Sequence, residues 1–132
     1  MQIMQAIDPV RGPAHGTIPY VPPLTIIDHI VAGRTELWSF GAPGEVNGRA
    51  VWRHLMENRE ILASCVRTFG LRIVKSMGLD FFRKHFDRKV ILGAPFQDYY
   101  PCLYEKDGDL ELRSQWVEYP LRPNDRFLRV LP

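Results

Sequence analysis

Prolines at the start of the chain limit what it can fold into more than any other feature. Residues 1–23 hold five of the eleven prolines of this 132-residue chain, together with Gly12 and Gly16. Because proline fixes φ and has no backbone N–H, this stretch forms neither a helix nor an interior strand. The sequence therefore predicts an extended, proline-rich arm over residues 1–23.

The arm also carries more apolar side chains than a solvated linker needs. We expect these side chains to lie on a surface, either of the same domain or of a neighbouring subunit, because an untethered terminal segment is normally mobile. The arm residues predicted to make this interaction are Ile7, Val10, Ile18 and Tyr20.

Residues 24–132 are predicted to form a single domain. Hydrophobic residues make up 45% of the chain and charged residues 24%, which is the balance of a globular protein. A chain of this length buries one core of its own. The expected fold class is α+β, with N-terminal and C-terminal antiparallel β-hairpins packed on two or three central helices.

The N-terminal hairpin is predicted over residues 24–31 and 35–40, which are rich in β-branched and aromatic residues on either side of Gly33. Asn47 is placed to cap a helix. Apolar residues at three-to-four spacing then predict one long amphipathic helix over residues 48–69, which Gly70 is expected to end or kink.

Further helical turns are expected over residues 71–77 and 79–86, and a short strand over residues 89–92. The C-terminal hairpin is predicted over residues 99–105 and 110–119, because Asp107-Gly108 favours a type I′ turn and the second segment alternates apolar and polar residues.

Pro120 and Pro123 are expected to end the sheet. The residues that follow would then form a short apolar tail in need of a surface. Phe127 and Leu128 of this tail are therefore predicted to join the interaction residues of the arm.

No residue pattern points to catalysis, to a metal or to a cofactor. No serine or cysteine stands in a nucleophile motif, and the glycines before residue 48 do not match a phosphate-binding loop. Cys65 and Cys102 are expected to be free thiols, with Cys65 buried and inert on a helix. The histidines, which are not spaced as a metal-ligand set, are His15, His29, His54 and His85.

Basic residues gather in the middle of the chain, although the net charge is only +2. If the helices present these residues on one face, they form a nucleic-acid-binding surface, with aromatic rings of the hairpin for base stacking. The basic residues of this alternative are Arg49, Arg53, Arg67, Arg83, Lys84, Arg88 and Lys89. The rings are Tyr99, Tyr100, Tyr104, Trp116 and Tyr119.

The segment after the basic middle is acidic, with six acidic against two basic residues over residues 90–119. An apolar arm, an apolar tail and neighbouring segments of opposite charge are typical of a subunit that packs against proteins. The sequence therefore favours a non-catalytic protein–protein interaction or assembly subunit, such as a viral or phage structural or accessory protein, with protein partners in a homo-oligomer or a larger assembly. One alternative is the nucleic-acid-binding domain. The other is a small enzyme or ligand-binding protein whose pocket holds His29, His54, His85 or a buried carboxylate.

The apolar stretches are shorter than a bilayer requires, and residues 1–4 do not resemble the start of a secretory signal. We expect a cytoplasmic protein, or one within a viral particle or a host cytoplasm, that does not contact a membrane.

Deleting residues 1–23 tests the prediction for the arm. We expect residues 24–132 to remain folded by circular dichroism, and the oligomeric mass by light scattering to fall, because the contact surface is removed while the core is kept. Loss of folding would instead make the arm part of the core.

Overall fold

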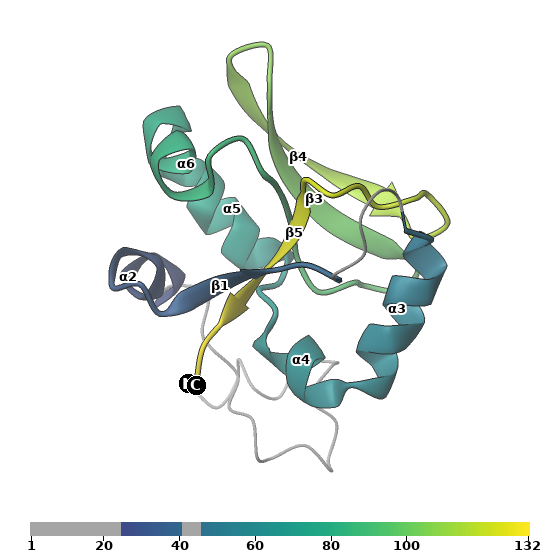
Figure 1. Cartoon of the computed structure of the whole chain (residues 1–132). Helices are drawn as coiled ribbons and strands as arrows, with labels where there is room; N and C mark the ends of the chain where they lie inside the picture. Colours follow the sequence, from purple (N-terminus) through teal and green to yellow (C-terminus); the bar gives the residue numbers. More distant parts are fainter. Residues whose placement is uncertain (1–24, 41–45) are drawn as a thin grey trace.

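A mixed sheet of five strands lies between two groups of helices in this computed structural model, which describes residues 25–40 and 46–132 (Figure 1). The strand order is β1-β5-β2-β3-β4. The strands are β1 (Thr35–Trp38), β2 (Val90–Leu92), β3 (Tyr99–Lys106), β4 (Asp109–Trp116) and β5 (Asp125–Val130). The helices are α2 (Ile26–Val31), α3 (Gly48–Glu57), α4 (Arg59–Ser64), α5 (Thr68–Ser76) and α6 (Leu79–Phe86). The α+β class predicted from the sequence is confirmed at this level.

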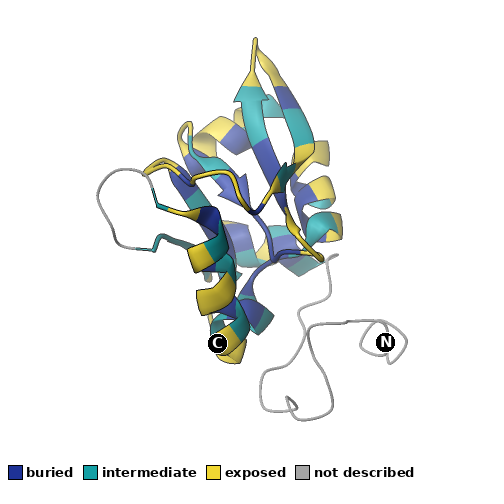
Figure 2. Cartoon of the chain, turned by 90° about the vertical axis from the view of Figure 1, so that its right-hand side faces the viewer, coloured by how far each residue is buried: buried dark blue, intermediate teal, exposed yellow. Residues whose placement is uncertain are grey.

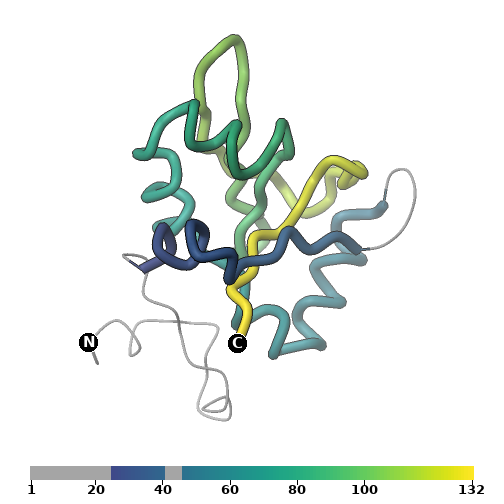
Figure 3. The backbone as a smooth tube through the Cα atoms, turned by 60° about the vertical axis from the view of Figure 1, so that its left-hand side comes forward, coloured from purple at the N-terminus to yellow at the C-terminus, as the bar shows by residue number. Residues whose placement is uncertain are grey.

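Strand β5 is an interior strand of the sheet, second from the β1 edge. It pairs antiparallel with β1, where Leu37 faces Leu128, and parallel with β2, where Leu92 faces Phe127. The backbone trace follows β1 and β5 side by side although they lie near opposite ends of the described chain (Figure 3). The sheet is completed by β3, antiparallel to β2, and by β4, antiparallel to β3.

Each face of the sheet carries its own hydrophobic core. Because neighbouring strand residues point to opposite faces, Leu128 packs with α2, α5 and α6, while Phe127 packs with α3 and α4. Colouring by burial places the buried residues along the strands and on the helix sides that face them (Figure 2). The domain is therefore a three-layer arrangement, with helices on both faces.

The predicted N-terminal hairpin is wrong, because Ile26–Val31 forms helix α2. Ile26 and Ile30 are four residues apart, so a helix places both on one buried face against α5 and the sheet. Packing of this apolar face overrides the β propensity of isoleucine. Strand β1 finds its partner in β5 and not in the residues just before it.

The predicted long helix over residues 48–69 is broken. Helix α3 ends at Asn58, whose side-chain amide donates to the His54 carbonyl at 2.8 Å, and α4 follows at once. Val66 then runs extended, with its N–H on the Leu128 carbonyl and its own carbonyl accepting from Ala94, each at 2.8 Å. These two hydrogen bonds tie the chain to the sheet, so the helix cannot continue through this point. Gly70 does not end a helix but lies inside α5.

Several local predictions are confirmed. The Asn47 side chain accepts from the N–H groups of Arg49 and Ala50, as an N-cap does. The C-terminal hairpin is present, and Asp107 and Gly108 both have positive φ, as a type I′ turn requires. Helix α6 covers residues 79–86, as expected from the position of Gly78.

The predicted apolar tail does not exist as a tail. The prolines at 120 and 123 end only the hairpin, and the chain then returns as β5. Phe127 and Leu128 are 0% exposed in the centre of the sheet. They therefore stabilise the core, and their prediction as interaction residues is wrong.

Gly48 provides a test of how closely α3 packs on the end of the hairpin. A Cβ at this position would lie 2.2 Å from the Val117 carbonyl oxygen and 2.3 Å from that of Tyr119. Because backbone cannot move aside cheaply, we expect Gly48→Ala to lower the free energy of unfolding by about 1–3 kcal/mol, measured by urea denaturation. Ala50→Ser, on the exposed side of the same turn, should change it by less than about 0.5 kcal/mol. Equal effects of the two substitutions would contradict the close packing.

Candidate protein-interaction surface

Four exposed aromatic residues lie together where the hairpin of β3 and β4 meets its flanking turns. Phe96, Tyr99, Trp116 and Tyr119 are 60%, 48%, 45% and 58% exposed. Tyr99 lies directly opposite Trp116 across the strand pair, and the rings of Trp116 and Tyr119 meet edge to face with centroids 6.2 Å apart. Phe96 and Tyr99 also line a shallow hollow of about 260 Å³. We call these four residues the aromatic surface.

A tight turn fixes the first half of the aromatic surface. Phe96 and Tyr99 exchange backbone hydrogen bonds of 2.9 and 3.1 Å, and Gln97 between them takes a positive φ of 55°. The indole N–H of Trp52, on α3, donates to the Gln97 carbonyl at 3.1 Å. The turn is therefore held from both strand β3 and helix α3.

Arg49 joins the turn before β3 to the turn after β4. Its guanidinium donates to Glu118 at 2.8 and 3.0 Å and to Asp98 at 3.2 Å. The hydrogen bond to Glu118 raises the pKa of Arg49 above its ordinary value. The guanidinium also lies over the Trp52 ring, 5.2 Å from the ring centroid. One side chain thus positions both turns that carry the aromatic surface.

Backbone contacts beneath the surface add to this support. The buried Tyr100 hydroxyl donates to the Gly48 carbonyl at 2.8 Å, and the Val117 N–H donates to the Asp98 carbonyl at 2.9 Å. Burial raises the pKa of Tyr100 well above its ordinary value, so this phenol remains a neutral donor. The exposed rings therefore project from backbone that is fixed on several sides.

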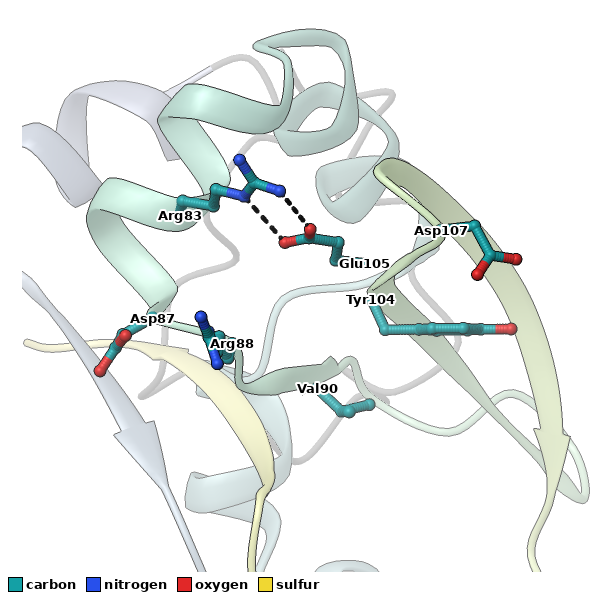
Figure 4. A pocket seen from close by; sticks show the side chains of 7 residues that line it. All are labelled: Arg83, Asp87, Arg88, Val90, Tyr104, Glu105 and Asp107. Carbon is teal, nitrogen blue, oxygen red and sulfur yellow. Dashed lines mark hydrogen bonds and ion pairs between the residues drawn. The ribbon is translucent and has the colours of Figure 1, made fainter.

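A first pocket, of about 610 Å³, lies between the end of α6 and the hairpin (Figure 4). Arg83 donates to the Glu105 carboxylate through two nitrogens, and this hydrogen bonding lowers the pKa of Glu105. Asp87, next to Arg88, and Asp107, across the pocket on the hairpin, add further negative charge to the lining (Figure 4). With two arginines against three acids, the pocket does not form a positively charged site for an anion.

A second pocket, of about 540 Å³, lies on the sheet face beside Tyr104, Cys102 and Asp125. Asp125 is buried, and its carboxylate accepts from the Arg122 N–H at 2.9 Å. Burial raises the pKa of Asp125 above its ordinary value. This is the buried carboxylate that a ligand-binding protein was expected to show, but here it closes the turn that leads into β5.

The two cysteines are free and buried. Burial raises the pKa of Cys65 to about 12 and that of Cys102 to about 12. Both thiols are therefore protonated at neutral pH, and a protonated thiol is a poor nucleophile. Cys65 lies just after α4 and not within a long helix, but it is buried as the sequence predicted.

Each histidine of the described chain has a contact within the fold. His29 is 2.8 Å from the Thr25 carbonyl, His54 stacks on Trp38, and His85 packs on Phe81. None of them lines either of the two larger pockets. Within residues 25–40 and 46–132, no group of three or more histidines, cysteines or acids is placed to hold a metal ion.

The seven predicted nucleic-acid-binding residues are not brought onto one face. Arg49 and Arg53 belong to α3, whereas Arg83 and Lys84 belong to α6 on the opposite side of the sheet. The remaining three lie elsewhere: Arg67 is half-buried before α5, and Arg88 and Lys89 follow α6. Folding therefore separates the basic residues that the sequence grouped.

Of the predicted interaction residues, Ile7, Val10, Ile18 and Tyr20 lie outside the described residues. Three members of the aromatic surface, Tyr99, Trp116 and Tyr119, were noted in the sequence as stacking rings, but Phe96 was not. The sequence feature that could have identified Phe96 is its position directly after Pro95, just before the hairpin.

None of the helices in the described part of the chain has the length and apolar character needed to cross a membrane.

The buried Asp125 carboxylate and the ion-paired Glu105 carboxylate predict opposite changes of stability with pH. Because the pKa of Asp125 is raised on folding, its contribution to stability is present at low pH and is lost as pH rises through the folded pKa. We therefore expect the stability of Asp125→Asn relative to the natural protein to increase between about pH 3 and pH 7. Glu105→Gln should show the reverse trend, because the pKa of Glu105 is lowered and its contribution is lost as pH falls. Urea denaturation at each pH measures both, and a pH-independent difference for Asp125→Asn would contradict the assignment.

No protein-family model, no curated protein sequence and no solved structure matches this chain. The function is therefore argued from the chain's own residues.

Proposed function

We propose that this chain is a non-catalytic protein-interaction subunit that binds another protein through the aromatic surface. The observation that carries the proposal is that Phe96, Tyr99, Trp116 and Tyr119 are exposed together on backbone fixed by Arg49 and Trp52. Clustered exposed apolar residues on a monomer mark an interaction site. Tyrosine and tryptophan are also the residues most often found to dominate binding energy at protein interfaces.

The fixed backbone makes the exposed rings well suited to binding a partner. A ring that is already held in place loses little conformational freedom when it is buried by a partner, so more of the gain from burial remains as affinity. A phenol or an indole offers a large apolar body with one polar group that stays hydrogen-bonded at the rim. These properties fit a stable protein interface.

Charge near the aromatic surface favours a protein over a nucleic acid. A single-strand binder combines stacking rings with excess positive charge on the same surface. Here the ring cluster adjoins Asp98 and Glu118, and the Arg49 guanidinium between them is bonded to both carboxylates. Phosphates would gain little from such a site.

The pockets give less support to the enzyme alternative. Arg83 of the first pocket is paired with Glu105, Arg113 of the second is paired with Glu111, and the Cys102 thiol beside Asp125 is protonated at neutral pH. The predicted contribution of the N-terminal arm remains part of the proposal, since its residues lie outside those described.

A photo-crosslinking experiment tests the proposed function. Benzoylphenylalanine, a photoreactive residue, replaces Phe96 in the full-length protein, which is crosslinked inside the cells that produce it. The control places the same residue at Met77, which is exposed and directly follows α5. We expect position 96 to give adducts of a few defined masses and position 77 to give none. Adding Tyr119→Ser should reduce the position-96 adducts about tenfold, since an interface hot spot contributes more than about 1.4 kcal/mol. Absence of adducts at position 96, or the same adducts from both positions, would contradict the proposal.

A further inference from the structure

Strand β4 is a long edge strand of the described sheet. Among the strands of residues 25–40 and 46–132 it lies at the end of the strand order and pairs only with β3, over eight residues in unbroken register. The hairpin that carries it extends beyond the helices (Figure 1). Natural edge strands are usually shortened, bulged or interrupted by proline, because a free edge pairs readily with another strand. Strand β4 has none of these features, whereas the other edge strand, β1, has four residues.

The hairpin geometry decides which backbone groups are free. A two-residue turn at 107–108 makes Lys106 and Asp109 a hydrogen-bonded pair, so from there every second residue of β4 directs its N–H and C=O toward β3. The backbone groups of Leu110, Leu112, Ser114 and Trp116 therefore point outward. The Leu110 N–H is bonded to the Asp109 side chain and the Trp116 carbonyl to the Tyr119 N–H, which agrees with this direction. Within the described residues, no hydrogen bond is found for the backbone of Leu112 or Ser114.

We propose that this edge pairs antiparallel with β4 of a second copy of the chain, with Leu112 opposite Leu112. The two sheets would then form one continuous sheet across a two-fold axis, and each copy would use the same surface. The inference rests on the proposed function in one respect, since it names the chain itself as one of its protein partners. Its observations are independent of the aromatic surface.

Charge selects this register over its neighbours. On the β4 face that carries Glu111 and Arg113, a pairing centred on Leu112 places Glu111 of each copy opposite Arg113 of the other. A pairing centred on Glu111 would oppose two glutamates, and one centred on Arg113 would oppose two arginines. Opposite charges across a strand pair stabilise it, and like charges destabilise it.

The existing ion pair supports the same arrangement. Within one copy, Arg113 donates to Glu111 at 2.8 Å. In the proposed pairing, the Glu111–Arg113 ion pairs of the two copies lie side by side. Each of these four charged side chains then has a neighbour of opposite charge in its own copy and another in the second copy. On the other face, the partly exposed Leu112 side chains meet and remove each other from water. The Ser114 N–H would donate to the Leu110 carbonyl of the second copy.

A charge swap in the full-length protein tests the pairing. Arg113→Glu and Glu111→Arg each place like charges across the axis, so we expect each to weaken dimerisation at least tenfold, on the order of 1.4 kcal/mol or more. The combined E111R/R113E variant restores opposite charges in both pairs and should bring dimerisation back to within about threefold of the natural chain. Sedimentation velocity over about 1–100 µM measures the dissociation constants. Glu57→Arg, on the exposed side of α3, matches the charge change of Glu111→Arg and should leave the dimer unchanged.

A second variant removes a backbone donor without changing charge. Ser114→Pro deletes an outward N–H for which the described residues of one copy provide no hydrogen bond, so it should prevent dimerisation while circular dichroism shows a folded chain. Arg113→Glu offers the same check if the proline variant does not fold. The pairing is overturned if the natural chain is monomeric at about 100 µM, if the single charge changes leave the dimer intact, or if the double variant fails to restore it.

These outcomes are separable from the proposed function. If the aromatic surface binds a different protein, position-96 adducts persist in Arg113→Glu. If only the pairing is correct, Tyr119→Ser leaves the dissociation constant of the dimer unchanged and position 96 gives no adducts.

Discussion

The backbone hydrogen bonds of β5 hold the whole domain together. This strand pairs with β1 on one side and with β2 on the other, and β2 in turn pairs with β3 of the C-terminal hairpin. Its side chains alternate between the two cores, with Phe127 beneath α3 and Leu128 beneath α5. Without β5, neither core would close, because each helical layer packs on a sheet face that this strand completes.

A second constraint acts at the N-terminus of α3. The close approach of Gly48 to the Val117 and Tyr119 carbonyls, and the bonds from Arg49 to Asp98 and Glu118, fix the open end of the β3–β4 hairpin, where β3 begins and β4 ends. The same contacts determine where Tyr99 and Trp116 are displayed. The most exposed apolar part of the described chain thus lies over one of its most firmly packed parts, and this combination distinguishes a binding surface from a poorly packed one.

One hairpin therefore carries both of the proposed interactions, by different physical means. The aromatic surface offers apolar area near the end of the hairpin where its flanking turns meet α3. The free edge of β4 offers backbone hydrogen-bonding groups and the alternating charges of Glu111 and Arg113. An assembly subunit contacts both different proteins and further copies of itself. The aromatic surface would supply the first kind of contact and the free edge of β4 the second.

Features set by a few neighbouring residues were determined by the sequence alone. Asn47 caps a helix and Asp107-Gly108 forms a hairpin turn, because the side-chain acceptor and the positive φ are local properties of these residues. Features that depend on distant partners were decided only by the tertiary structure. Residues 26–31 became a helix because α5 and the sheet bury one side of them, and residues 125–130 became an interior strand because they pair with β1 on one side and β2 on the other. The candidate site divides in the same way: its tyrosines and its tryptophan were visible in the sequence, but their support by Arg49, and the separation of the basic residues onto opposite faces, required contacts between residues far apart in the chain.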